Sequence, residues 1–260
     1  MADGNIQVCR MPLWMENSWL INLKQMTDNC SIVIPVFNEE EILEKRIRDL
    51  SEDLKNYFRE FEIIITENGS VDNTKDIIRK LASELSCVVA EIDDGAADYG
   101  QALINGINRA KFDNVTILEV DYLDMIFLKK SNELLSEYDL IIGSKKLAGE
   151  MDQRPFKRKL FTSLYNFGLR ITCGLKLTET HGLKTFKKSK LDHITNGCVT
   201  RHAVWPSEFC IRASKDKNIR IKEIPLSIPL VEIRTTRIKA ISRLKKTISD
   251  VMLLSRTINK

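Results

Sequence analysis

The sequence has no run of roughly 20 apolar residues, the length that a helix needs to cross a bilayer, so no membrane-spanning helix is predicted. The first 30 residues lack the basic start, apolar core and small-residue cleavage site of a signal peptide. The six cysteines are scattered without a CxxC pair, which excludes a recognisable zinc site and a disulfide framework. These absences are typical of a protein of the reducing cytosol.

Signatures of several function classes are also missing. There is no P-loop, no nucleophile elbow and no helix-turn-helix pattern, and the three histidines form no HxxxH or HxxE pair. The basic residues lack interleaved aromatics and a recognisable module, so a nucleic-acid partner is not expected. No internal repeat or low-complexity linker divides the chain. A single domain with an appended C-terminal lobe is therefore predicted.

The composition is that of a globular protein, but the charge is distributed unevenly along the chain. The 260 residues are 43% hydrophobic and 29% charged, enough to bury a sizeable core. The formal net charge is only +4, but from Arg234 onward many Lys and Arg residues accompany a single acid, Asp250. This asymmetry indicates an anionic partner near the C-terminus, or else a solvated basic helix.

Strands and helices alternate along the first half of the chain. Short apolar runs predict strands at 31–36, 61–66, 87–92, 115–118 and 139–146. Helices are expected at 39–58, at 99–110 and at 127–137, and another is expected to begin after a cap at Asp72 or Asn73 and to end near Leu85. Further on, helices are expected at 154–174, near 207–217 and from 238, with a strand at 219–228. The rhythm predicts right-handed βαβ units, and so an α/β fold with a mostly parallel, doubly wound sheet.

An acidic cluster ends the fourth predicted strand. The stretch DNVTILEVDYLD passes from buried apolar residues into Glu119, Asp121 and Asp124. In an open parallel sheet the ligand crevice lies beyond the carboxyl ends of the strands, so these acids are placed to hold a cation or a sugar. A plain polar loop after a strand is the alternative.

The ordered set VIPVFNEEEIL, ENGSVDNT, YGQALINGINRA, DNVTILEVD and IIGSKK resembles the family 2 glycosyltransferases. The similarity runs over residues 31–225 and is greatest to the dolichol-phosphate mannosyltransferase and polyprenyl-phosphate glycosyltransferase branch. The resemblance implies a nucleotide-sugar-binding GT-A fold with a C-terminal helical lobe. It also implies three parts: an N-terminal extension (1–30), the GT-A domain (31–230) and a basic amphipathic C-terminal helix (231–260).

Carried over by position, the motifs of the family imply donor-binding residues at the ends of the first strands. Glu67 and Asn68 stand where the family usually has two aspartates, and base and ribose recognition is the role expected of Glu67. The residues implied for donor binding are Pro35, Asn38, Glu39, Glu67, Asn68, Gly100, Gln101, Glu119, Val120 and Asp121.

The metal motif of the family falls on Glu119-Val120-Asp121, so Glu119 and Asp121 are the expected ligands of Mg²⁺ or Mn²⁺. Residues two apart at a strand end point the same way and can share one cation. Such a metal would neutralise the diphosphate leaving group as its charge develops. Asp121 and Glu119 are also the expected catalytic residues, together with Glu208, where the family often has an acid ahead of a helix.

Basic residues in the later part of the chain match positions at which members of the family bind the phosphate of the acceptor. TETHGLKTF resembles the segment DxTxGFR, with Thr178 in place of the aspartate and Lys184 in place of the arginine. Lys and Arg are natural ligands of phosphate. The residues implied are Lys145, Arg154, Arg158, Lys184, Arg234 and Arg237.

The expected reaction is an inverting, metal-dependent transfer of a sugar from a GDP- or UDP-sugar to an acceptor, with a polyprenyl (dolichyl) phosphate favoured. The QxxRW motif of polymer-building relatives is absent. The alternatives are a soluble glycosyltransferase with a hydroxyl acceptor and a nucleotide-binding pseudoenzyme. The second is considered because Glu67, Asn68, Glu119, Thr178 and Lys145 depart from the usual residues. The basic C-terminal helix could rest on an anionic membrane, which would make the protein cytoplasmic with peripheral membrane contact.

Overall fold

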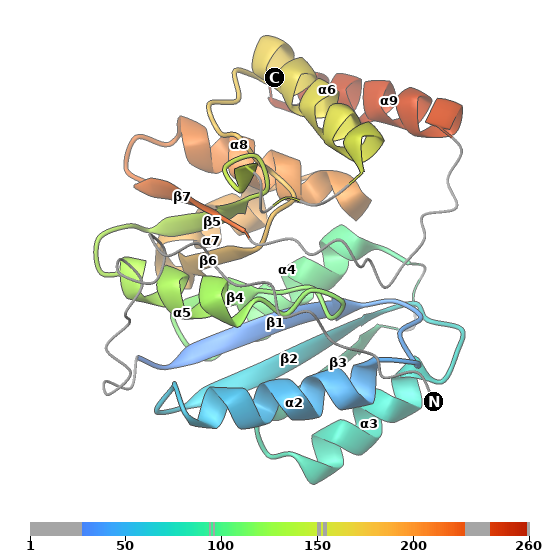
Figure 1. Cartoon of the computed structure of the whole chain (residues 1–260), viewed down its shortest axis with the longest axis vertical. Helices are drawn as coiled ribbons and strands as arrows, with labels where there is room; N and C mark the ends of the chain where they lie inside the picture. Colours follow the sequence, from blue (N-terminus) through green and yellow to red (C-terminus); the bar gives the residue numbers. More distant parts are fainter. Residues whose placement is uncertain are drawn as a thin grey trace, which may run out of the picture.

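The structure is a computed structural model, and it describes residues 28–93, 95, 97–149, 152, 155–226 and 240–258 (Figure 1). Its centre is a seven-stranded sheet with the order β3-β2-β1-β4-β6-β5-β7. The strands are β1 (Cys30–Val36), β2 (Phe61–Asn68), β3 (Val88–Asp93), β4 (Asn114–Ile117), β5 (Leu140–Ser144), β6 (Lys184–Lys187) and β7 (Ile221–Pro225). Every neighbouring pair is parallel except those that β6 makes with β4 and β5.

Helices cover both faces of this sheet, as the alternation of elements predicts. They are α2 (Leu43–Lys55), α3 (Thr74–Glu84), α4 (Tyr99–Arg109), α5 (Met125–Leu134), α6 (Phe156–Cys173), α7 (Lys188–Gly197), α8 (Trp205–Lys215) and α9 (Ala240–Ile258), with a short 3₁₀ turn η2 (His202–Val204). In Figure 1, α2 and α3 lie together at one end of the molecule, and α6 and α9 at the other.

The central strands bury both faces, which explains their unbroken apolar runs. Ile32 and Ile34 of β1 point to one face and share a core with α2, α3 and α5. Val33, between them, points to the opposite face and joins Leu103 of α4 and Phe209 of α8. Because successive side chains of a strand alternate, a single short sequence supplies two separate cores.

Three features differ from the sequence-based expectation. The segment GLKTF contributes β6, which runs antiparallel between β4 and β5, and α7 follows it directly. β4 ends at Ile117, because a bridge between Glu119 and Tyr122 turns the chain at once. The prediction of an α/β fold with a mostly parallel sheet is confirmed.

The C-terminal helix α9 is docked on the domain. Gly168 of α6 allows a close approach, since a Cβ there would lie 3.3 Å from the side chain of Val251. Leu254 of α9 is fully buried in the same core as Leu169 of α6. Among the helices of the described ranges, none has the length and apolar character needed to span a membrane.

Candidate active site

The carboxyl ends of β1, β2 and β4 open on one edge of the sheet, because these strands are parallel neighbours. The loops that follow them carry the acidic and amide side chains singled out by the sequence. In parallel α/β sheets this edge is where ligands bind. It is the candidate donor edge of the site.

The loops after β1 and β2 are joined by hydrogen bonds between side chains and backbone. The N–H of Asn38 donates to Ser70 Oγ (2.9 Å), and Asn38 Oδ1 accepts from the N–H of Val71 (2.9 Å). The N–H of Glu39 donates to Thr74 Oγ1 (2.8 Å). Asn38 holds a left-handed conformation (φ 54°), which asparagine tolerates better than most residues. These contacts give both loops a fixed shape.

Glu67 lies at the end of β2 and is almost completely buried. Its Oε1 accepts from the N–H of Ser70, while its Oε2 lies 3.7 Å from Lys75 Nζ and has no hydrogen bond among the described residues. A buried carboxylate oxygen without a donor is costly unless a ligand supplies one. Glu67 can therefore accept a hydrogen bond from a hydroxyl or an N–H of a bound molecule.

The next loop folds tightly over the end of β2. Gly69 has φ 76°, and a Cβ there would lie 2.9 Å from Gly95 O and Ala97 N, so only glycine fits. Asn68 Oδ1 accepts from the N–H of Asp98, and Asp98 caps α4 by accepting from the N–H of Gln101 (3.0 Å). The start of α4 is thereby fixed beside the donor edge.

Glu119, the first acid of the metal motif, is paired with a tyrosine. The hydroxyl of Tyr99, at the first position of α4, donates to Glu119 Oε1. Burial raises the pKa of Glu119 to about 7; the Tyr99 hydrogen bond opposes this rise, nearby Asp121 adds to it, and Lys145 and Lys184 oppose it more weakly. Glu119 is therefore a carboxylate whose charge changes close to neutral pH.

The other two acids of the stretch have separate roles. Asp121 is exposed, next to the buried Val120. Asp124 caps α5, with Oδ1 accepting from the N–H of Phe127 (2.8 Å) and Oδ2 accepting from the hydroxyl of Tyr122 (2.8 Å). Asp124 is thus engaged by the protein itself, while Asp121 faces solvent.

A divalent cation fits these residues through Asp121. No group of three or more His, Cys, Asp or Glu side chains converges within the described part of the chain, so the protein does not form a closed metal cage there. An exposed carboxylate is a ligand that Mg²⁺ accepts while its remaining positions stay open for waters and substrate phosphates. One oxygen of Glu119 is occupied by Tyr99, which leaves Asp121 as the better placed of the two predicted ligands.

The remaining predicted donor residues have mainly packing contacts. Pro35 is buried within β1. Gly100 is packed so closely that a Cβ there would lie 2.8 Å from Trp205 Cβ, which joins α4 to α8. The side chain of Gln101 donates to Asn105 Oδ1 (2.7 Å). Their roles in donor binding stay predictions.

Thr178 stands where the family has an aspartate, and a carboxylate from another part of the chain contacts the segment around it. Glu223 of β7 accepts from the Thr178 N–H (2.9 Å), the Thr178 hydroxyl (2.8 Å) and the Glu179 N–H (3.1 Å). Thr178 Oγ1 also lies 2.6 Å from Ser144 Oγ at the end of β5. Glu223 therefore fixes this loop against the sheet.

Two buried charges follow in the same segment. Lys184 of β6 is 3% exposed and donates to Gly182 O (2.8 Å); burial lowers its pKa. Burial opposes ionisation of Glu179, but Lys145 and the N–H groups of His181 and Thr180 hold the pKa of Glu179 below its usual value. Lys184, predicted to bind phosphate, is thus covered by protein, and its role stays a prediction.

A pocket of about 220 Å³ lies between the loop after β5 and one face of α6. Four cations line it, with a single acid, Asp152; the cations are Lys145, Lys146, Lys159 and Arg170. Asn166 also lines it, and its buried Oδ1 has no hydrogen bond among the described residues. Of these cations, only Lys145 was predicted from the sequence. Lys159 and Arg170 are 11 residues apart on α6, and folding brings them together with Lys146.

Glu208, predicted to be catalytic, is fully buried on α8. Its carboxylate accepts from the N–H groups of Val199 (3.1 Å) and Thr200 (2.7 Å) and from Arg212 Nε (2.7 Å). Burial alone would raise the pKa of Glu208, but the hydrogen bonds from Thr200, Arg212 and Val199 hold it below its usual value. These contacts suit a residue that fixes the 198–200 loop, and a catalytic role stays a prediction.

The side chains of four predicted phosphate ligands lie outside the described part of the chain. Arg154, Arg234 and Arg237 lie outside the described residues, as does the side chain of Arg158. The N-terminal extension predicted at 1–30 also lies almost entirely outside the described residues, which begin at residue 28.

Comparison with curated proteins gives relatives of modest identity. The chain is 27% identical to the glycosyltransferase AglD of Haloferax volcanii over 202 residues, 75% of this chain and 32% of that protein. It is 35% identical to an undecaprenyl-phosphate 4-deoxy-4-formamido-L-arabinose transferase of Serratia proteamaculans over 94 residues, 35% of this chain and 28% of that protein. The chain thus spans about a third or less of the length of these two relatives.

Among solved structures, the fold is similar to that of M. tuberculosis glucosyl-3-phosphoglycerate synthase in complex with Mn²⁺, UDP and glucosyl-3-phosphoglycerate. The TM-score is 0.62 at 18% identity, over 96% of this chain and 86% of that one. The predicted GT-A fold is thereby confirmed. Residues 31–195 match the model of glycosyl transferase family 2, and the chain belongs to that family.

Proposed function

We propose that this protein transfers a sugar from a nucleotide-sugar donor to a lipid phosphate of the polyprenyl type, with inversion at the anomeric carbon. The observation that carries the acceptor half of this proposal is the cationic pocket beside α6. Lys145 lines that pocket and also acts electrostatically on Glu119 at the donor edge. A phosphate held in the pocket would therefore lie next to the diphosphate of a bound donor.

Two features of the donor edge support nucleotide binding: its loops are already fixed, and one buried carboxylate oxygen has no hydrogen bond among the described residues. The loops after β1 and β2 are already joined by Asn38 and Glu39, so little ordering is needed on binding. Glu67 Oε2 is available to accept a hydrogen bond from a ribose or base. The Serratia relative is named for transfer involving undecaprenyl phosphate, and the mycobacterial structure contains UDP, which agrees with both halves of the proposal.

In the proposed reaction an oxygen of the acceptor phosphate forms a bond to the anomeric carbon, and the bond from that carbon to the nucleoside diphosphate breaks. The electron pair leaves with the diphosphate. A phosphate is already an anionic nucleophile at neutral pH, so no strong general base is required. A divalent cation held by Asp121 would supply charge neutralisation for the leaving group. Lys145 contributes positive charge between the two phosphates.

A hydroxyl acceptor is the second candidate. The observation that favours it is the raised pKa of Glu119. A hydroxyl must lose its proton, and a carboxylate with a pKa near the working pH is a suitable base. Burial raises the pKa of Glu119 to about 7, which meets that condition.

A transfer assay with labelled GDP- and UDP-sugars separates these candidates. The acceptors are a short-chain polyprenyl phosphate, the matching polyprenol without phosphate, and free sugars. We expect product with the phosphate only. Product with the hydroxyl acceptors alone would favour the second candidate, and calorimetry that shows no binding of any donor, with or without Mn²⁺, would contradict a transferase altogether.

The pocket is tested by Lys146→Ala, because Lys146 lines it from an exposed position. Loss of one charged contact to phosphate should raise the KM for the acceptor about 10-fold, with the donor KM unchanged. Lys190→Ala on α7 is the matched control, an exposed lysine that does not line the pocket. Equal acceptor KM values in both variants would remove the pocket from the proposal.

A further inference from the structure

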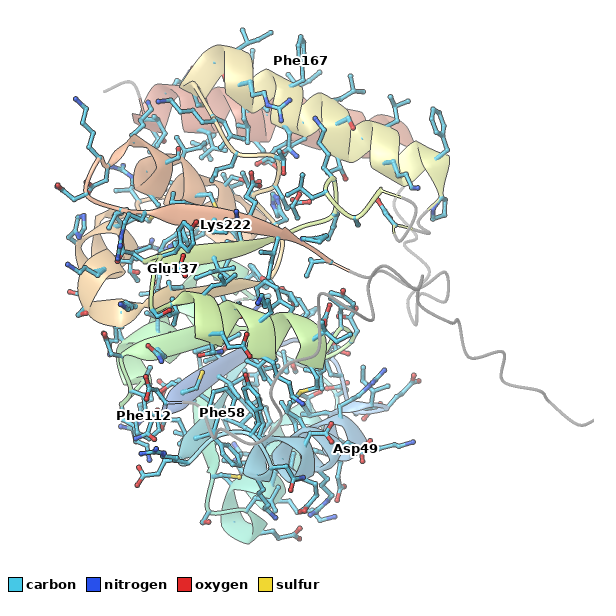
Figure 2. The ribbon with its side chains drawn as sticks, turned by 60° about the vertical axis from the view of Figure 1, so that its left-hand side comes forward. Asp49, Phe58, Phe112, Glu137, Phe167 and Lys222 are labelled. Atoms are coloured by element: carbon cyan, nitrogen blue, oxygen red, sulfur yellow. The ribbon has the colours of Figure 1, made fainter. Side chains whose placement is uncertain are left out.

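Helix α6 exposes a continuous apolar stripe along its whole length. Its members recur at spacings of four, four, three and four residues, which places them on one side of the helix. They are Phe156 (76% exposed), Leu160 (46%), Leu164 (46%), Phe167 (58%) and Ile171 (69%). Figure 2 shows Phe167 pointing away from the body of the molecule.

This stripe is distinct from the face by which α6 packs. Tyr165, Leu169 and Cys173 face the core, and Gly168 meets Val251 of α9. The helix therefore has two apolar faces, and the second has no cover among the described residues.

Exposed large hydrophobic side chains are concentrated at this end of the protein. Thirteen are exposed in the described part of the chain, and eight of them lie on α6 and α9; those on α9 are Ile248, Met252 and Leu253. Figure 1 shows the two helices packed together at one end of the molecule. Monomeric proteins expose single apolar residues freely, but a contiguous group marks a contact with an apolar partner.

The charge of the same two helices identifies the partner. Together α6 and α9 contain eight Lys and Arg residues and one acid, Asp250. The whole chain has a net charge of only +4, so the rest of it is net acidic. Two copies that met through this end would bring like charges together, which opposes self-association. An anionic lipid surface satisfies both the apolar stripe and the positive charge.

The stripe also lies beside the cationic pocket on the same helix. Lys159, Ser163, Asn166 and Arg170 line the pocket, and each directly precedes a residue of the stripe. One residue advances the helix by about a quarter turn. A lipid whose tail follows the stripe into a bilayer would thus present its phosphate to the pocket.

We propose that the apolar stripe of α6 is a membrane-docking surface, on which the protein rests with α6 at the interface of an anionic bilayer. This inference deepens the proposed function and rests on it for the identity of the acceptor. Phe156, Phe167 and Ile171 enter the acyl boundary, and the net positive charge of α6 and α9 favours an anionic surface. The pocket then opens beside the bilayer surface.

Co-sedimentation of the full chain with vesicles tests the docking surface. The vesicles contain phosphatidylcholine alone or phosphatidylcholine mixed with phosphatidylglycerol, without polyprenyl phosphate or donor, so the result does not depend on catalysis. We expect binding to the anionic vesicles, weakened about 10-fold or more by the double substitution Phe167→Ser/Ile171→Ser. The control is Ile126→Ser/Val199→Ser, which removes two hydrophobic residues that are 52% and 65% exposed elsewhere, and should bind as the wild type does.

The outcomes separate the alternatives. Both double variants should keep the wild-type melting temperature, because exposed side chains contribute little to stability. Equal sedimentation of the wild type and Phe167→Ser/Ile171→Ser, or equal binding to neutral and anionic vesicles, would overturn the proposal. So would a lipid-free wild-type dimer that this variant converts to a monomer in analytical ultracentrifugation. Transfer activity without vesicle binding would remove the docking surface and leave the proposed function intact.

Discussion

The donor edge and the α6 end of the protein are built in opposite ways. At the donor edge, polar side chains such as Asn38, Asn68 and Asp98 already hold the backbone of neighbouring loops. At the α6 end, four cations surround one acid in a pocket, and an apolar stripe lies beside them in solvent. The first arrangement fixes geometry in advance, and the second attracts a ligand by charge and burial. Substitutions at the donor edge should therefore alter turnover or folding, whereas those near α6 should alter acceptor and lipid affinity.

Asp121→Ala should cause the largest loss of activity at the donor edge, because Asp121 is the exposed acid of the predicted metal motif. We expect turnover to fall about 1,000-fold, since charge stabilisation by a metal is worth several kcal/mol. The dependence of donor binding on Mn²⁺ should also be lost, as measured by calorimetry. The stability of the variant should match that of the wild type.

Asp124→Ala is the control for that substitution. Asp124 caps α5, so its loss should lower the free energy of unfolding by about 1 kcal/mol. The Mn²⁺ dependence of donor binding should remain. An unaltered titration for Asp121→Ala, or a lost one for Asp124→Ala, would show that the wrong acid has been identified as the ligand.

Glu208→Gln should act on stability, because both oxygens of Glu208 accept hydrogen bonds within the fold. We expect a loss of about 2 kcal/mol in the free energy of unfolding at pH 7, as for a buried charged hydrogen-bond network. The pKa of Glu208 is lowered in the folded protein, so its stabilisation is present above the unfolded pKa and is lost as the pH falls through the folded pKa.

Urea unfolding across this pH range measures the effect. The difference between wild type and Glu208→Gln should shrink as the pH falls below about 4.3, the ordinary pKa of glutamate. A variant with normal stability but lost turnover would instead place Glu208 in the chemistry.

Tyr99→Phe should have the smallest effect on activity, and it tests whether the charge of Glu119 matters for the reaction. The hydroxyl of Tyr99 stabilises the ionised form, so its removal should raise the pKa of Glu119 above about 7. If the ionised form is active, the acid limb of the pH profile of kcat/KM moves to higher pH. We expect about threefold lower activity at pH 7, with recovery at alkaline pH.

Tyr57→Phe provides the matched control, because the hydroxyl of Tyr57 donates to Lys129 O, outside the site. Its pH profile should coincide with that of the wild type. An unshifted profile for Tyr99→Phe would mean that the charge of Glu119 does not limit the reaction.

Much of the fold could be predicted because strands and helices have their own periodicity. The apolar runs of β1 and β2 and the helix-period pattern of α4 gave these elements nearly to the residue. The direction of β6 could not be predicted, since a four-residue strand looks the same whether it runs parallel or antiparallel. The pairing of Tyr99 with Glu119 was missed for a similar reason, because it joins residues 20 positions apart through the packing of α4 against the sheet.

The sequence by itself determined the family, the order of the elements and the acids at the end of β4, because these depend on local pattern and short motifs. Only the tertiary structure decided what those acids do: Asp124 became a helix cap, Glu119 a partner of Tyr99, and Asp121 alone remained in solvent. It also decided which apolar face of α6 is covered. A helical pattern shows that two faces are apolar, but only the positions of α8, α9 and the sheet determine which one is buried and which is left for a partner.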